Sequence, residues 1–310
     1  MFHHQVTVCP PVERSYGFIS VGIRDRRGRA VKMPVPFISY DSLFAVRPGP
    51  ALQTGQAMPG GIWAGVLTSD FGHWLTETVP YLAACRDLLD RHPDLPLIGV
   101  TRPRRPVNWS SLHHRFAARV GVDLDKVRIL SQPTRVERLL IPPDPFGARC
   151  RYREAAILGI DRIFALHPTR ARRRVYYSRS ALPDHQKRPT DGSEFDALFR
   201  ARGWDIVYPE QIDLDEQIAT AASADEIAGT SGSALHWALF APSARRVISI
   251  GKRLQLQDGI CRARGQVHLN FADSLLPRRL QSRRAIIRST RVAAWLDDLP
   301  DLPAHEDSTQ

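Results

Sequence analysis

At 310 residues, the chain is long enough for two α/β domains, each with its own hydrophobic core. A hydrophobic content of 43% and a charged content of 24% are typical of a soluble globular protein, which argues against a disordered or fibrous chain. The net charge of +11 indicates an anionic partner. We do not expect a nucleic acid, because no recognition-helix pattern, aromatic-basic RNA motif or zinc-finger spacing accompanies the charge.

The sequence shows no signal for export or for insertion into a membrane. Its N-terminal residues, MFHHQVTVCP, lack a charged segment followed by an apolar one, and no apolar run is long enough to cross a bilayer. The cysteines are scattered without a CxxC pair, which suits a reducing compartment. We therefore expect a cytoplasmic protein. The basic residues 278–291 are either a solvated surface or a peripheral contact with the inner face of a membrane.

Residues 1–68 alternate short β-prone runs with turn residues, and this pattern predicts a β-rich entry to a first α/β domain. A helix is predicted next, because Leu75, Val79 and Leu82 recur at helical spacing. Pro80 should interrupt that helix, since proline lacks the N–H that an inner helical turn needs. We expect the break at Val79.

Polar candidates for catalysis lie in the first turns of this helix. His73 and Glu77 are four residues apart and therefore share a face roughly opposite the apolar stripe. Asp70 precedes them, where the helix is expected to begin. The histidine and glutamate are either a structural hydrogen bond or a base with the carboxylate that orients it, and spacing alone leaves both interpretations open.

Strands alternate with helices through both halves of the chain, so we predict two Rossmann-like parallel-sheet domains with a cleft between them. A helix over residues 152–166 is expected to connect the halves. The predicted division is an N-terminal domain over residues 1–150, a C-terminal domain over 151–275, and a tail over 276–310 that crosses back to the first domain.

The second half contains a predicted phosphate site. An apolar run ending at Ala228 meets the small-residue turn GTSGS, and a helix-like segment and a strand follow, as in a βαβ unit. The turn should present N–H groups and hydroxyls at the positive end of a helix. The end of the strand over 174–177 should lie at the same sheet edge. The candidates are Ser178, Arg179, Thr230, Ser231, Gly232 and Ser233.

Two Asp-x-Asp triplets, at residues 123–125 and 213–215, allow two interpretations. Such carboxylates could bind a metal together with a diphosphate, or they could cap the elements that follow them. We favour caps, because both triplets precede helix-like or strand-like runs.

Three separated blocks occur in an order that resembles glycosyltransferase family 61, which includes bacterial transferases for capsular and surface polysaccharides. The resemblance covers roughly residues 60–250, and its blocks are FGHWLTETVP, then VYYSRSAL with Arg188 downstream, then GWDIVYPEQIDLDEQIATAASADEIAGTSGSALHWALF. It implies a GT-B fold and an inverting transfer from a nucleoside-diphosphate sugar to a glycan or lipid-linked saccharide. It also implies that neither a metal nor another cofactor is required.

The resemblance gives roles to the acceptor-side residues. His73 is the first choice for the base that takes the proton of the acceptor hydroxyl, and Asp70 is the second. Glu77 would orient the imidazole or bind the acceptor. Asp70 departs from the family pattern, which usually has asparagine there.

On the donor side, Arg179 and Arg188 suit contact with the departing diphosphate, because guanidinium groups bind phosphate through paired hydrogen bonds. Gln217 matches the family in the helix before the glycine turn. Ser231 stands where the family frequently has histidine. Because of these departures, the alternative function is a non-catalytic scaffold of the same fold that binds a glycan or a nucleotide sugar.

Overall fold

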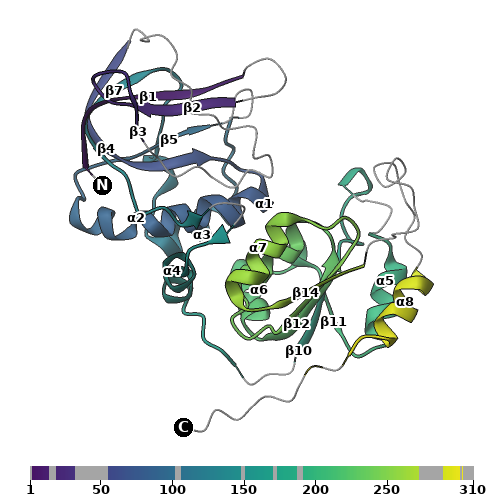
Figure 1. Cartoon of the computed structure of the whole chain (residues 1–310). Coiled ribbons are helices and arrows are strands. Elements are labelled where there is room, and N and C mark those ends of the chain that lie inside the picture. Colours follow the sequence, from purple (N-terminus) through teal and green to yellow (C-terminus); the bar gives the residue numbers. More distant parts are fainter. Residues whose placement is uncertain are drawn as a thin grey trace, which may run out of the picture. The chain divides into compact units, whose positions relative to one another are not determined.

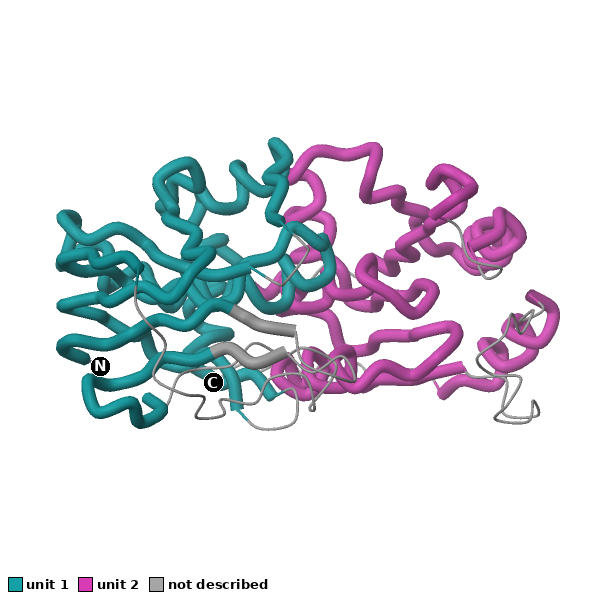
Figure 2. The backbone as a smooth tube through the Cα atoms, turned by 90° about the horizontal axis from the view of Figure 1, so that it is seen from above, with its two compact units in different colours: residues 1–166 teal, residues 167–310 magenta. Residues whose placement is uncertain are grey.

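The computed structural model describes residues 2–13, 19–31, 55–101, 106–147, 151–169, 173–186, 191–271, 289–300 and 302. The chain forms two compact units, which comprise residues 1–166 and residues 167–310 (Figure 2). Each unit is built around its own β-sheet, with helices packed on it (Figure 1). The protein is therefore of the mixed α/β class that the alternating pattern predicts.

Within the described residues, the first unit contains a mixed seven-stranded sheet in the order β3-β2-β1-β7-β4-β5-β6. The neighbours β3, β2, β1 and β7 pair antiparallel with one another. The neighbours β7, β4, β5 and β6 pair parallel. The prediction of a parallel sheet in the first domain is therefore correct only in part, because strands of the β-rich entry pair antiparallel. The strands are β1 (Phe2–Glu13), β2 (Ile19–Arg24), β3 (Ala30–Val31), β4 (Gln56–Leu67), β5 (Leu97–Thr101), β6 (Arg128–Ile129) and β7 (Thr134–Leu140).

Helices cover one face of this sheet (Figure 1). They are α1 (Phe71–His73), the π-helical turn η2 (Trp74–Thr78), α2 (Val79–Arg91), α3 (Ser111–Val120) and α4 (Glu154–Phe164). Helix α4 packs against both α2 and α3 and therefore belongs to the first unit. The units accordingly divide after Leu166, later in the chain than the boundary that we expected at residue 150.

The second unit contains, among its described residues, a parallel five-stranded sheet in the order β11-β10-β12-β13-β14. The strands are β10 (Arg173–Tyr177), β11 (Asp205–Val207), β12 (Ala224–Thr230), β13 (Arg246–Ile250) and β14 (Val267–Phe271). Strand order therefore reverses between β10 and β12. In an open doubly wound sheet, the crevice at the carboxyl ends of the strands on either side of this reversal is where ligands bind.

Helices lie on both faces of this sheet (Figure 1). Helix α5 (Ser193–Arg200) packs against α8 (Ser289–Asp297), while α6 (Leu214–Ala222) and α7 (Gln255–Arg264) both pack against the 3₁₀ helix η6 (Ser233–Phe240). Connections on both faces are what a doubly wound parallel sheet requires, since each crossover places a helix over the sheet.

We expected the C-terminal tail to cross back to the first unit. Its described helix, α8, packs on the second unit instead. Val292 of α8 is fully buried in the core of the second unit, beside Phe195 and Phe199. Arg202 also donates hydrogen bonds of 2.8 and 2.9 Å to the two carboxylate oxygens of Asp297. Apolar burial and this paired contact hold α8 where it is. Residues 276–288, 301 and 303–310 of the predicted tail lie outside the described residues.

Candidate functional site

The helical segment after β4 changes its geometry next to a proline. Helix α2 begins at Val79, where we expected a break, but the turn before it, η2, is π-helical and continuous with it. Pro80 cannot donate to the carbonyl of Thr76, four residues earlier. The hydroxyl of Tyr152 donates to that carbonyl instead, at 2.8 Å. A side chain distant in sequence thus satisfies the acceptor that the proline leaves open, and π turns of this kind are frequent at functional sites.

We predict that Tyr152→Phe lowers the free energy of unfolding by about 1–3 kcal/mol, because the buried Thr76 carbonyl loses its donor. Urea unfolding of both proteins measures the change. Adding Pro80→Ala restores a backbone N–H in the same turn, so the double variant should recover part of the loss. Equal unfolding midpoints for Tyr152→Phe and the unmodified protein would contradict this account.

The predicted contact between His73 and Glu77 is present. The Nδ1 atom of His73 lies 2.6 Å from Oε1 of Glu77, and the side-chain exposures are 25% and 3%. A carboxylate accepts the Nδ1 proton, so the neutral imidazole keeps its Nε2 lone pair for another proton. The half-buried imidazole can therefore act as a base, with the buried glutamate fixing its orientation.

Asp70 lies immediately before α1, at the N-cap position, and is exposed. Its backbone carbonyl accepts the N–H of Trp74 at 2.8 Å, while its side chain makes no capping hydrogen bond. Asp70 therefore lies close to His73 in sequence and in space, and its side chain does not cap the helix.

An aromatic cluster lies beside this segment. The fully buried Trp74 meets His113 edge to face, with ring centroids 4.8 Å apart, and Trp109 at 5.3 Å. Burial lowers the pKa of His113, so its ring is neutral at pH 7. The segment with Trp109 is linked to the start of α1, because the N–H of Asn108 donates to Oγ of Ser69 at 3.2 Å. Trp109 is only partly buried and can present its ring face to a sugar.

A polar cluster lies at the predicted edge of the second sheet, where β10 and β12 end. Arg179 donates from Nε to Oδ2 of Asp191 at 3.0 Å, and Thr230 donates its hydroxyl to the other oxygen at 2.7 Å. The Asp191 side chain is fully buried, and Arg179 is 15% exposed. A second donor of Arg179, Nη2, binds the carbonyl of Gln186 at 3.2 Å. These contacts orient the guanidinium, and no hydrogen bond among the described residues uses Nη1, which could meet a ligand.

A second carboxylate supports the same edge. Asp196 accepts hydrogen bonds from the hydroxyls of Ser178 and Ser180, both at 2.6 Å, and from Tyr208 at 2.9 Å. Ser178 is buried and uses its hydroxyl in this network. The role of Ser178 in the structure is therefore to fix the strand end that carries Arg179.

The glycine turn differs in detail from the predicted phosphate cradle. The Thr230 hydroxyl is directed to Asp191, and the Ser231 N–H pairs with the carbonyl of Ile250 at 2.9 Å, so neither group is available. Within the described part of the chain, the N–H groups of Gly232 and Ser233 have no such partner. They open η6 and are the donors that could meet a phosphate.

One further donor-side candidate stands apart from this cluster. Gln217 is buried on α6 and donates to the carbonyl of Ile212 at 2.9 Å, and no hydrogen bond described by the structure joins it to Arg179 or Thr230. Arg188 lies outside the described residues. The structure thus brings Ser178, Arg179, Thr230, Ser231, Gly232 and Ser233 to one sheet edge.

Both Asp-x-Asp triplets are caps, as favoured above. Asp123 accepts the N–H of Asp125 at 3.1 Å, and Asp213 accepts the N–H of Glu216 at 2.9 Å. Across the described ranges, no group of three or more histidine, cysteine, aspartate or glutamate side chains could hold a metal ion.

Across the same ranges, no helix is both long and apolar enough to cross a membrane.

Sequence reasoning missed Asp191, Asp196 and Trp109. The one available signal was at Asp196, an acidic residue between Phe195 and Phe199, which both lie on the buried face of α5. A carboxylate on an apolar helix face indicates a buried hydrogen-bond network. Asp191 and Trp109 lie in irregular segments, so no periodicity marks them.

Fold and geometry together define an α/β protein with a polar, arginine-bearing site at the switch point of a doubly wound sheet. The family model of glycosyltransferase 61 matches residues 71–248, which is more than half of the chain. The chain belongs to glycosyltransferase family 61 and is a glycosyltransferase. The matched range contains every candidate site residue except Asp70. A comparison with curated proteins found no match.

Proposed function

We propose that the chain transfers a sugar, with inversion, from a nucleoside-diphosphate sugar to a hydroxyl of a glycan acceptor. The observation that supports this most strongly is the cluster at the switch point of the second sheet. There, a fully buried carboxylate, Asp191, holds Arg179 beside the glycine turn, at the edge where open α/β sheets bind ligands. A charge held in this way is suited to an anionic leaving group.

The base in this proposal is His73. Inverting transfer needs a group that takes the proton of the acceptor hydroxyl as the new bond forms. Glu77 accepts the Nδ1 proton, so Nε2 of His73 receives the hydroxyl proton, and the buried carboxylate then stabilises the imidazolium. Asp70, the other candidate, is exposed, whereas the carboxylate that orients His73 is buried. Trp109 would provide a stacking face for the acceptor sugar.

The leaving diphosphate carries the charge that has to be stabilised. The Nη1 group of Arg179 and the N–H groups of Gly232 and Ser233 supply donors to it, and Arg188, nine residues after Arg179 in the sequence, is a further candidate cation. In this proposal these groups act without a bound metal ion. Asp191 and Asp196 position the donors and do not contact the donor sugar.

Three broader features belong to the same proposal. The two units would form a GT-B arrangement, with the donor on the second unit and the acceptor on the first. The resemblance to transferases of capsular and surface polysaccharides supports a role in the assembly of such glycans. The reaction would take place in the cytoplasm or at the inner face of the membrane, where a lipid-linked acceptor can be reached.

We expect one nucleoside diphosphate or nucleotide sugar to raise the melting temperature by about 5–10 °C at roughly 100 times its Kd. The rise should persist in EDTA and should vanish in Arg179→Ala. Arg200→Ala, which removes an exposed arginine from α5, is the matched control and should keep the rise. A thermal-shift panel measures this. No response to any nucleotide would favour a non-catalytic, glycan-binding scaffold instead.

A further inference from the structure

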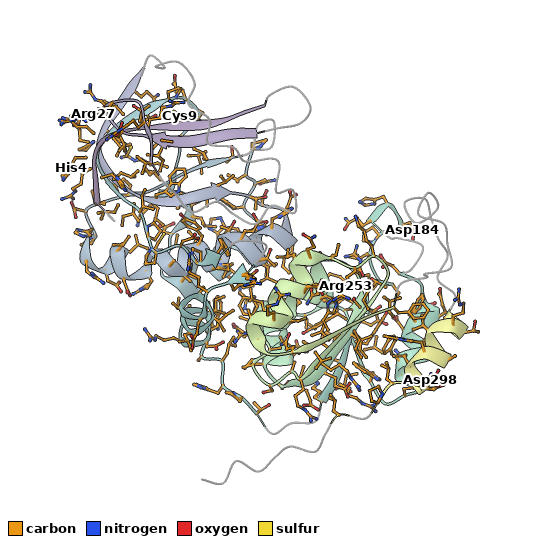
Figure 3. The ribbon with its side chains drawn as sticks, in the orientation of Figure 1. His4, Cys9, Arg27, Asp184, Arg253 and Asp298 are labelled. Atoms are coloured by element: carbon orange, nitrogen blue, oxygen red, sulfur yellow. The ribbon has the colours of Figure 1, made fainter. Side chains whose placement is uncertain are left out.

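A groove lies on the first unit, over strands β1, β2 and β7. It consists of two adjoining cavities of about 830 and 420 Å³, which share Gln5, Asp25, Arg26 and Glu137 among their linings. Figure 3 shows His4 and Arg27 on this side of the unit. Arginine dominates the lining. The arginines are Arg24, Arg26, Arg27, Arg29, Arg135 and Arg138.

The sheet and one tight turn bring these arginines together. Arg24 and Arg135 both pair with Thr7 of β1, from opposite sides, so their side chains leave the same face of the sheet about 10 Å apart. The turn after β2 is fixed by Asp25, whose Oδ1 accepts the N–H groups of Arg27 and Arg29 at 2.9 Å each. The turn therefore holds its arginines in a defined place.

The carboxylates of the groove are already engaged. Asp25 pairs with Arg29 at 2.8 Å, and Glu137 pairs with Arg135 at 3.0 Å. By contrast, the exposed guanidinium groups of Arg26 and Arg27 have no hydrogen-bond or ion-pair partner among the residues that the structure describes. The charge that the groove can offer a ligand is therefore positive.

The groove is remote from the candidate base along the sheet. Arg135 of β7 pairs with Ala57, near the start of β4. Strand β4 ends at Leu67, and His73 lies after this end. At 3.3 Å for each residue, these points are about 30 Å apart. One sugar bound at His73 therefore cannot reach the groove, so an acceptor that uses both places would have to be a chain of several sugars.

We infer that this groove binds an acidic saccharide chain, whose carboxylate or phosphate groups meet Arg26 and Arg27. The inference rests on the proposed function, since it defines the acceptor as an anionic polymer held at two places. Guanidinium groups match both kinds of anion through paired hydrogen bonds.

The lining residues favour an acidic saccharide over an anionic membrane surface or a nucleic acid. The exposed large apolar side chains of the described residues are Leu158 and Val267, and neither lines the groove, so no apolar side chain is available there to enter a bilayer. The lining also has no phenylalanine, tyrosine or tryptophan on which a nucleic-acid base could stack. The amide of Gln5 can instead form hydrogen bonds with sugar hydroxyls.

The test compares the double variant Arg26→Ala/Arg27→Ala with Arg162→Ala/Arg200→Ala, which removes the same charge from exposed helix positions. Fluorescence anisotropy measures binding of an oligogalacturonate, a phosphorylated oligomannose and a neutral maltooligosaccharide. We expect the groove variant to lose about tenfold in affinity for an acidic probe, the control to change by less than about twofold, and the neutral probe to bind neither.

Three results would overturn the inference. They are absent binding of both acidic probes to the unmodified protein, an equal loss in the two double variants, and groove-dependent binding to phosphatidylglycerol vesicles without binding to the acidic saccharides. The measurement contains no donor and no turnover. A protein that binds acidic saccharides in this way but fails the nucleotide panel would therefore disprove the proposed transfer and leave the groove assignment intact.

Discussion

Replacing His73 by glutamine should lower kcat by about 10²–10⁴-fold, the usual contribution of a positioned general base. Glutamine keeps the polar side chain but cannot take the acceptor proton. Glu77→Gln should cause a smaller fall, because the imidazole remains while its orienting carboxylate is lost. Initial rates with the donor identified by the thermal-shift panel measure both effects.

Two controls make this result specific. His114→Gln changes a histidine on α3 whose side chain is 40% exposed, and it should leave kcat unchanged. Asp70→Asn tests the other candidate base. If Asp70→Asn abolishes turnover while His73→Gln retains it, the assignment of the base to His73 is wrong. The melting temperature of every variant must be measured, because Glu77 is buried.

Asp191→Ala should lower the free energy of unfolding by about 3–5 kcal/mol. Asp191 is fully buried, and its removal leaves the largely buried Arg179 without its ion-pair partner and the Thr230 hydroxyl without an acceptor. Asp191→Asn should cost less, since the amide oxygen can still accept from Thr230. Both variants should lose the nucleotide response, because the guanidinium is no longer held.

Chemical denaturation measures these changes in stability. Asp87→Ala is the matched control, since its side chain is 78% exposed and its contact with Arg91 spans 3.7 Å. It should change stability by less than about 0.5 kcal/mol. An Asp191→Ala protein as stable as this control would show that the buried carboxylate does not hold the cluster together.

Local pattern predicted much of the second unit correctly. The strand starting near Arg174 and the helix before the glycine turn, which holds Gln217, lie where the sequence placed them, within a few residues. Hydrophobic periodicity and capping residues are properties of consecutive positions, so they can be recognised without knowledge of the fold. The first sheet was less predictable, because its antiparallel part depends on which strands meet.

The contact between His73 and Glu77 was predictable for the same reason, since a four-residue spacing brings side chains together on any helix. The π turn that follows His73 and contains Glu77 was not. Within this turn, the carbonyl of Thr76 accepts a hydrogen bond from Tyr152, a residue much later in the chain. Pro80 marked the place of the irregularity, whereas the partner of the Thr76 carbonyl could not be predicted from neighbouring residues.

The sequence by itself determined the α/β class, the membership of family 61 and the strand ends at which Arg179 and Thr230 lie. The tertiary structure alone decided that Asp191 joins those two residues, and that arginines from β2 and β7 share one groove. The physical reason is the separation in sequence of the residues that make each contact. Helix and strand patterns are encoded in neighbouring residues, whereas these contacts exist only once strand order and loop closure have brought separate segments together.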